Sequence, residues 1–120
     1  MNHKKTILVV DSDKLLLNTL GVQLGGEGFE VLQAEDGKTA WDKIVAEKPE
    51  VVVLELVLLK KNGFELLRDI HSEFPQTPVF VFSKLAGESD IKKAKSLGAR
   101  EYFTKKEITI KSIIDKVKSL

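Results

Sequence analysis

The chain has no cysteine, only three prolines, and no apolar run long enough to cross a membrane. Without cysteine it forms no disulfide, no thiolate metal site and no thiol nucleophile, a composition that suits a reducing compartment. The first apolar run stops at Asp11, well short of the roughly 20 residues that a transmembrane helix needs. We therefore expect a cytoplasmic domain that does not associate with membranes.

An excess of charge of either sign is also lacking. The chain carries 19 lysines and arginines against 18 acids, which leaves a formal net charge of +1. This balance provides no broad electrostatic field for nucleic acid or for an anionic membrane surface, so we expect neither as a partner. Repeats and low-complexity linkers are missing too, and a length of 120 residues is typical of one domain. We expect residues 1–120 to form that single domain.

Short apolar runs predict five β-strands. They lack polar alternation, which indicates strands buried on both faces, as in a parallel sheet. Only the second alternates enough to suggest an edge. The runs are Ile7–Val10, Phe29–Gln33, Val51–Leu54, Val79–Phe82 and Glu101–Phe103.

Amphipathic patterns between these runs predict five helices. The first has Leu16, Leu20 and Leu24 on one stripe, with Asp13 or Ser12 as its N-cap. The other stripes are Ala40–Val45, Phe64–Phe74, Ile91–Leu97 and Ile110–Val117. Five strand–helix units linked by right-handed crossovers predict an α/β fold with one open, doubly wound parallel sheet.

Polar residues follow the strands at one end of this sheet. Asp11, Ser12 and Asp13 follow the first strand, and Glu55 follows the third. Ser83 ends the fourth strand and Lys105 follows the fifth. Ligands of such sheets bind beyond the carboxyl ends of the strands, so we expect these side chains to converge there. Carboxylates suit a divalent cation, whereas a hydroxyl and an ammonium suit phosphoryl oxygens.

Over nearly its full length the chain resembles the receiver domain of bacterial response regulators. The resemblance rests on ILVVDSD at 7–13, AEDG at 34–37, PEVVVLE at 49–55, NGFELL at 62–67, PVFVFS at 78–83 and GAREYFTK at 98–105. It implies a flavodoxin-like (βα)5 sheet with strand order 2-1-3-4-5. It also implies a signalling and interaction module in two-component phosphorelay rather than an enzyme.

The resemblance assigns a role to each polar position. An acid pair after the first strand, here Asp11 and Ser12, helps to hold Mg²⁺. An aspartate after the third strand, here Glu55, accepts a phosphoryl group from a sensor histidine kinase. Ser83 and Lys105 contact that group, and an aromatic residue, here Tyr102, changes position with Ser83 as the switch. Partners or a second copy bind the face formed by the fourth helix, fifth strand and fifth helix.

Two of these positions depart from the family pattern. Glu55 is one methylene longer than aspartate, which shifts the attacking oxygen by roughly 1.5 Å, and misalignment of about 1 Å costs on the order of a hundredfold in rate. Ser12 offers a neutral hydroxyl where a hard dication prefers a carboxylate. We therefore predict an atypical, phosphorylation-independent pseudo-receiver. It has no expected cofactor and weak or absent Mg²⁺ binding, with Asp11 and Glu55 as ligands if the metal binds.

Several lysines fall in loops near the same end of the sheet. Lys84 follows Ser83 where the family has a small residue, and Lys106 replaces a proline, so a trans bond is expected after Lys105. With Lys60 and Lys61 these residues predict a basic rim around the pocket. We expect this rim to bind an acidic partner segment or a small anion in a salt-sensitive manner.

Three other interpretations remain open from the sequence. Glu55 can be a buried acid paired with Lys105 or Lys84 without any signalling role. The chain can be a conventional phosphoacceptor receiver in which Glu55 or a neighbouring acid accepts the phosphoryl group, or one whose natural acceptor has been replaced by Glu55 as an engineered mimic. The third is a small haloacid-dehalogenase-like phosphatase with Asp11 as nucleophile and Asp13 as general acid. Such an enzyme needs a further acidic motif after Lys105, where this sequence has only Glu107 and Asp115.

Overall fold

The computed structural model describes residues 4–120, which form five strands and five helices in strict alternation. The strands are β1 (Thr6–Val10), β2 (Glu30–Ala34), β3 (Val51–Leu54), β4 (Val79–Ser83) and β5 (Glu101–Thr104). The helices are α1 (Lys14–Gly26), α2 (Gly37–Glu47), α3 (Gly63–Glu73), α4 (Glu88–Ser96) and α5 (Ile110–Lys118). Each observed element overlaps the range predicted for it.

The strands form one parallel sheet in the order β2-β1-β3-β4-β5. The predicted fold class and strand order are therefore confirmed. The register aligns Val10 of β1 with Leu54 of β3, so Asp11 and Glu55 leave the sheet side by side. The alternating run predicted as an edge, β2, is an edge, and β5 is the other.

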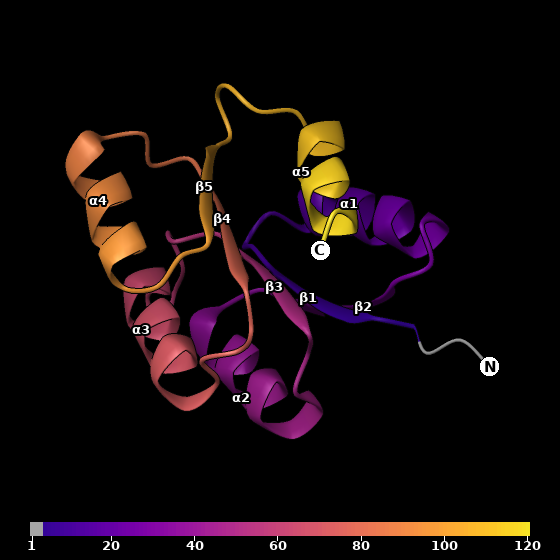
Figure 1. The fold of residues 1–120 in the computed structure, drawn as a ribbon, viewed down its shortest axis with the longest axis horizontal. Coiled ribbons are helices and arrows are strands. Elements are labelled where there is room, and N and C mark those ends of the chain that lie inside the picture. Colours follow the sequence, from indigo (N-terminus) through magenta and orange to yellow (C-terminus); the bar gives the residue numbers. More distant parts are fainter. Residues whose placement is uncertain (1–3) are drawn as a thin grey trace.

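Helices cover both faces of the sheet, with α1 and α5 on one face and α2, α3 and α4 on the other (Figure 1). Strand side chains alternate between the two resulting cores. Leu8 and Val52 face α2 and α3, whereas Ile7 and Val53 face α1 and α5. Because both faces are covered, β1, β3 and β4 are continuous apolar runs, as parallel sheets require.

Short polar side chains begin four of the helices. Asp13, Asp36, Asn62 and Thr109 accept hydrogen bonds from backbone N–H groups in the first turns of α1, α2, α3 and α5. These bonds satisfy N–H groups that have no partner within the helix. Asp13 is thus the cap of α1, as expected, and is not turned into the pocket.

Two details differ from the predicted apolar stripes. In α1 the buried leucines are Leu17, Leu20 and Leu24, while Leu16 is half-buried. In α2, Val45 is 47% exposed, because the helix turns this side chain away from the sheet.

Within residues 4–120 all peptide bonds are trans, including the bond after Lys105. No helix in that range is both long and apolar enough to span a membrane.

Candidate functional site

The polar residues predicted to converge do so at the carboxyl ends of four adjacent strands. Asp11 follows β1, Glu55 follows β3, Ser83 ends β4 and Lys105 follows β5. Backbone hydrogen bonds continue the sheet into these residues, from Glu55 N to Val10 O (3.0 Å) and from Lys105 N to Ser83 O (2.9 Å). Asp11, Glu55 and Ser83 are each no more than 3% exposed. The sheet therefore positions the site rigidly.

The carboxylate of Glu55 is contacted by five hydrogen-bond donors. Its Oε2 binds the backbone N–H of Leu56 (2.6 Å) and of Val57 (3.1 Å), and also the hydroxyl of Ser83. Its Oε1 binds the backbone N–H of Lys84 (3.1 Å) and the ammonium of Lys105 (3.0 Å). Five donors from three loops thus surround one carboxylate.

These donors also set the charge of Glu55. Burial alone raises the pKa of its carboxyl group, but hydrogen bonds from Ser83, from the backbone of Val57 and from Lys105 outweigh burial and lower the pKa. Glu55 is consequently ionised at neutral pH. A negative charge is thus held permanently at the centre of the pocket.

Lys105 joins the two buried carboxylates. Its ammonium lies 2.6 Å from Oδ2 of Asp11 and 3.0 Å from Oε1 of Glu55, and 5.7 Å from the centre of the Phe82 ring. Burial alone lowers the pKa of Lys105, but the bonds to Asp11 and Glu55 outweigh burial and raise it. Each buried carboxylate therefore has a cationic partner, although the two share a single ammonium, and burial of a charge requires such pairing.

A second set of hydrogen bonds runs from the pocket toward β5. The backbone N–H of Leu85 donates to Oγ of Ser83 (3.1 Å), and the hydroxyl of Tyr102 donates to the carbonyl of Leu85 (2.6 Å). The ring of Tyr102 is partly buried against the core beside α4. Glu55 is thereby connected through Ser83 and the loop after β4 to the aromatic residue of β5.

The donor set does not suit Mg²⁺. Oδ1 of Asp11 accepts the backbone N–H of Asp13 (2.9 Å) and Oδ2 binds Lys105, while both oxygens of Glu55 are also engaged. Ser12 is exposed and adds no charge. Residues 4–120 contain no group of three or more acidic, histidine or cysteine side chains that could hold a metal ion. An ammonium stands between the carboxylates of Asp11 and Glu55, where a dication needs anionic oxygen.

The predicted basic rim is only partly present. Lys61 is not part of the rim, because its ammonium forms ion pairs with Asp69 (2.6 Å) and Glu65 (3.2 Å) on α3 and lies over the ring of Trp41. Lys60 lies 3.8 Å from Asp36. Lys84 and Lys106 are exposed and form no ion pair within the described part of the chain. Two free ammonium groups therefore remain beside Lys105.

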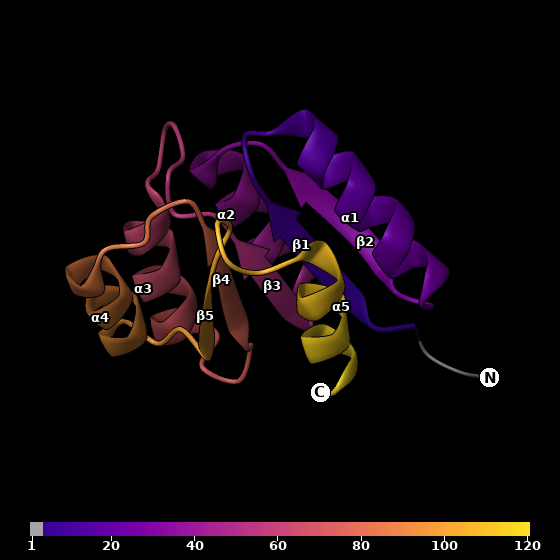
Figure 2. The same cartoon turned by 90° about the horizontal axis from the view of Figure 1, so that it is seen from above.

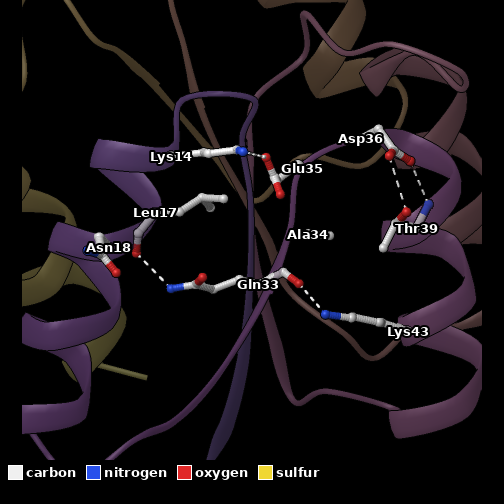
Figure 3. A pocket seen from close by; sticks show the side chains of 9 residues that line it. All are labelled: Lys14, Leu17, Asn18, Gln33, Ala34, Glu35, Asp36, Thr39 and Lys43. Atoms are coloured by element: carbon white, nitrogen blue, oxygen red, sulfur yellow. Dashed lines mark hydrogen bonds and ion pairs between the residues drawn. The ribbon is translucent and has the colours of Figure 1, made fainter.

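An open hollow lies at the β2 edge, and Glu55 is not among the residues that line it (Figure 3). Its volume is about 520 Å³. Gln33 and Lys43 cross it, donating to the carbonyls of Leu17 and Gln33 respectively. One bond occupies a carbonyl of the β2 edge and the other a carbonyl of α1, so the hollow resembles a capped edge more than a prepared ligand site.

Sequence reasoning missed the backbone part of the pocket. These are the backbone N–H groups of Leu56, Val57 and Lys84 and the carbonyl of Leu85; three of the residues are apolar, and Lys84 was expected to act through its side chain. Only their position one or two residues after Glu55 or Ser83 could have indicated them. Their role depends on how each loop turns, which residue type does not reveal.

Comparison with known proteins gives one consistent result. Residues 7–118 match the family model of the response regulator receiver domain. The alkaline phosphatase synthesis transcriptional regulatory protein PhoP of Bacillus subtilis (strain 168) is 33% identical over 101 residues, which are 84% of this chain and 42% of that protein. The chain thus spans less than half the length of this relative.

Two solved structures share the complete fold. A CheY-like receiver domain protein from Methanospirillum hungatei JF-1 is 26% identical, covers 98% of this chain and 93% of its own, and superposes with a TM-score of 0.92. The receiver domain of the Francisella response regulator 1452 is 25% identical, with coverage of 97% and 95% and a TM-score of 0.89. The chain therefore belongs to the response regulator receiver domain family and is a receiver domain of two-component signalling.

Proposed function

We propose that this receiver signals without phosphorylation, because the carboxylate of Glu55 takes the place of a phosphoryl group. The observation that carries the proposal is the set of five donors around that carboxylate. They include the hydroxyl of Ser83 and the ammonium of Lys105, the groups that contact the phosphoryl group in this family. The extra methylene of glutamate carries the negative charge out to these donors.

This arrangement holds the switch in one state. Glu55 fixes the hydroxyl of Ser83 and the backbone of Lys84, and Ser83 in turn fixes Leu85. Tyr102 then bonds the carbonyl of Leu85. A receiver with this permanent charge acts on its protein partners through constant binding by the face of α4, β5 and α5, rather than through a timed switch.

Weak or absent Mg²⁺ binding is part of the same proposal. Lys105 forms ion pairs with both Asp11 and Glu55, and Ser12 brings no third carboxylate. A dication entering here would displace the ammonium and repel it at short range. Without a well-held metal and with a displaced acceptor, phosphoryl transfer from a sensor kinase is not expected.

The partner surface near the pocket is basic. Lys84 and Lys106 are exposed beside Lys105 and have no ion pair within residues 4–120. We extend the proposal to a partner with an acidic segment that meets these two lysines. Its binding should weaken as salt is added, because exposed charges are screened over about 10 Å at 0.1 M ionic strength. A Lys84→Gln and Lys106→Gln double variant should lose this salt dependence.

Treatment with acetyl phosphate and Mg²⁺, followed by intact-protein mass spectrometry, tests the proposal. The unmodified chain should gain no phosphoryl group, and a Ser12→Asp and Glu55→Asp double variant should gain one. Glu55→Asp alone separates the contribution of the acceptor from that of the metal site. A phosphoryl gain on the unmodified chain that disappears in Glu55→Gln would instead establish a conventional phosphoacceptor receiver.

A further inference from the structure

The outer face of α1 is unusual for this chain. In a protein with 31% charged residues, none lies between Lys14 and Glu27, so 12 consecutive residues carry no charge. The inner face, Leu17, Leu20 and Leu24, is buried on the sheet. Leu15 and Val22 are nevertheless 76% and 73% exposed. The outer face of α1 therefore carries exposed apolar side chains beside uncharged polar ones, and this face is open (Figure 2).

The exposed Leu15 and Val22 share one stripe with Thr19, which is partly exposed. Leu15, Thr19 and Val22 follow one another at intervals of four and three residues, and Asn18 lies beside them, so all project from one side of the helix. A hollow of about 270 Å³ is lined by Leu15, Asn18, Thr19, Val22 and Gln23. Gly26 continues the stripe without a side chain, and an added Cβ there would meet nothing within 4 Å. The surface can therefore accept a closely packed helix.

We propose that this stripe, Leu15, Asn18, Thr19 and Val22, binds the same stripe of a second copy in antiparallel orientation about a two-fold axis. Two-fold contacts are reciprocal, so residue numbers in contact must add to a constant. An axis between Asn18 and Thr19 places Leu15 against Val22 of the other copy and Asn18 against Thr19 of the other copy. Each apolar side chain then meets an apolar one, and each polar side chain a polar one.

The polar pair supplies complementary hydrogen-bonding groups. The side-chain amide of Asn18 has no hydrogen bond within residues 4–120. Thr19 donates its hydroxyl to the carbonyl of Leu15 (2.9 Å), and its oxygen still has acceptor capacity. Asn18 can therefore donate to Thr19 of the second copy, twice per dimer. A single polar pair within an apolar helix seam also selects one register.

The charges at the two ends of α1 favour the antiparallel arrangement. Lys14 stands in the first turn and Glu27 caps the last, with no acid in the first turn and no base in the last. Each charge is thus at the unfavourable end of its own helix dipole. An antiparallel neighbour makes the placement of these charges favourable, because Lys14 then lies beside the negative, C-terminal end of the other helix dipole. A parallel neighbour would repeat the unfavourable placement.

The contact is small, so the dimer should be weak. A helix of 13 residues is about 20 Å long, and a single helix pair of that length buries less than a standard interface. We therefore expect association to depend on concentration between the micromolar and millimolar range. The proposal concerns a different face from the Glu55 pocket and stands independently of the function proposed above.

Sedimentation equilibrium across that concentration range tests the contact. The apparent mass should rise from 13.4 kDa toward twice that value. Leu15→Lys and Val22→Glu should each weaken association by about tenfold or more, which corresponds to about 1.4 kcal/mol. The double variant should recover it, because the two new charges of opposite sign meet across the two-fold axis. Val45→Glu, at an exposed valine of α2, is the matched control and should associate like the unmodified chain.

Three results would overturn the proposal. The first is a monomer at every concentration, which is also the result expected if α1 binds a helix of a different protein. The second is association that persists in both single variants, which would locate the contact on another face. The third is failure of the double variant to recover association while its circular dichroism stays native, which would exclude the antiparallel two-fold geometry.

Discussion

The ammonium of Lys105 lies 3.0 Å from Oε1 of Glu55, and the same nitrogen lies 2.6 Å from Oδ2 of Asp11. One cation is thus shared by two buried anions that follow different strands, which leaves the three groups with one net negative charge. Coulombic attraction in this partly desolvated site is stronger than in water, and loss of the cation would leave two uncompensated charges. The first prediction concerns this cation.

Lys105→Met should lower the free energy of unfolding by about 3 kcal/mol or more, because breaking a buried ion pair typically costs 3 to 5 kcal/mol. Lys106→Met, at the next residue, is the matched control. Its side chain is exposed and has no ion pair in the described residues, so its effect should stay within about 0.5 kcal/mol. Urea unfolding followed by circular dichroism measures both. Equal effects would contradict a compensating role for Lys105.

The stability of the domain should depend on Glu55 in mild acid. The pKa of Glu55 is lowered from its ordinary 4.5, because hydrogen bonds from Ser83, Val57 and Lys105 outweigh burial. Its stabilising contribution is therefore complete above pH 4.5 and is lost as the pH falls through the lower, folded-state pKa. Glu55→Gln should flatten the decline of unfolding free energy below pH 4.5. Superimposable pH profiles would show that Glu55 titrates normally.

Tyr102→Phe should release the loop after β4 without unfolding the domain. The variant keeps the ring and removes only the hydroxyl that donates to the carbonyl of Leu85 (2.6 Å). A hydrogen bond of this kind contributes about 0.5 to 1.5 kcal/mol. Hydrogen exchange should accelerate at Leu85 and its neighbours, while amides of β1 and β3 stay protected. Unchanged exchange at Leu85 would mean that Tyr102 does not restrain the switch.

Added Mg²⁺ should leave the thermal stability of the unmodified chain unchanged, because Lys105 already occupies the space between Asp11 and Glu55. Ser12→Asp with Glu55→Asp should gain stability in Mg²⁺, since a ligand that binds only the folded state raises its melting temperature. Differential scanning calorimetry with and without the metal measures this. Stabilisation of the unmodified chain by millimolar Mg²⁺ would contradict the proposed loss of metal binding.

Two glycines should respond in opposite directions to alanine. A Cβ on Gly37 would lie 1.7 Å from the carbonyl oxygen of Lys61, whereas a Cβ on Gly25 meets nothing within 4 Å. Gly37→Ala should therefore push away the loop that follows Glu55 and destabilise the domain by about 1 to 3 kcal/mol. Gly25→Ala, inside α1, should stabilise it by about 0.5 to 1 kcal/mol. Thermal melts of the two variants give the comparison, and a stabilising Gly37→Ala would show that the loop is free to move.

Much of the fold could be read from local patterns. The runs Ile7–Val10 and Val51–Leu54 indicated buried parallel strands, because a strand covered on both faces has no reason to alternate. Boundaries were less certain for the run Glu101–Phe103, because the strand there, Glu101–Thr104, lies at an edge and its four residues are only partly buried. Leu16 packs against the core but is less buried than Leu17, because the run Leu15–Leu17 is apolar throughout and its periodicity does not select one direction.

The candidate site, like the fold, was predictable only in part. Asp11, Glu55, Ser83 and Lys105 were predictable, because parallel strands deliver whatever follows them to one edge of the sheet. The direction in which each long side chain points could not be predicted from the sequence. Lys61 was expected beside the pocket, but Asp69 and the ring of Trp41 draw its ammonium to the surface between α2 and α3.

By itself, the sequence determined the five strand–helix units, the family, and the presence of a glutamate where an aspartate accepts phosphate. Residue type and spacing are enough for this, because they control burial and turn formation locally. The tertiary structure alone decided what that glutamate contacts. The N–H groups of Leu56, Val57 and Lys84 face it only because two loops bend around it. Backbone donors occur at every residue, so only the folded chain selects which of them meet a charge.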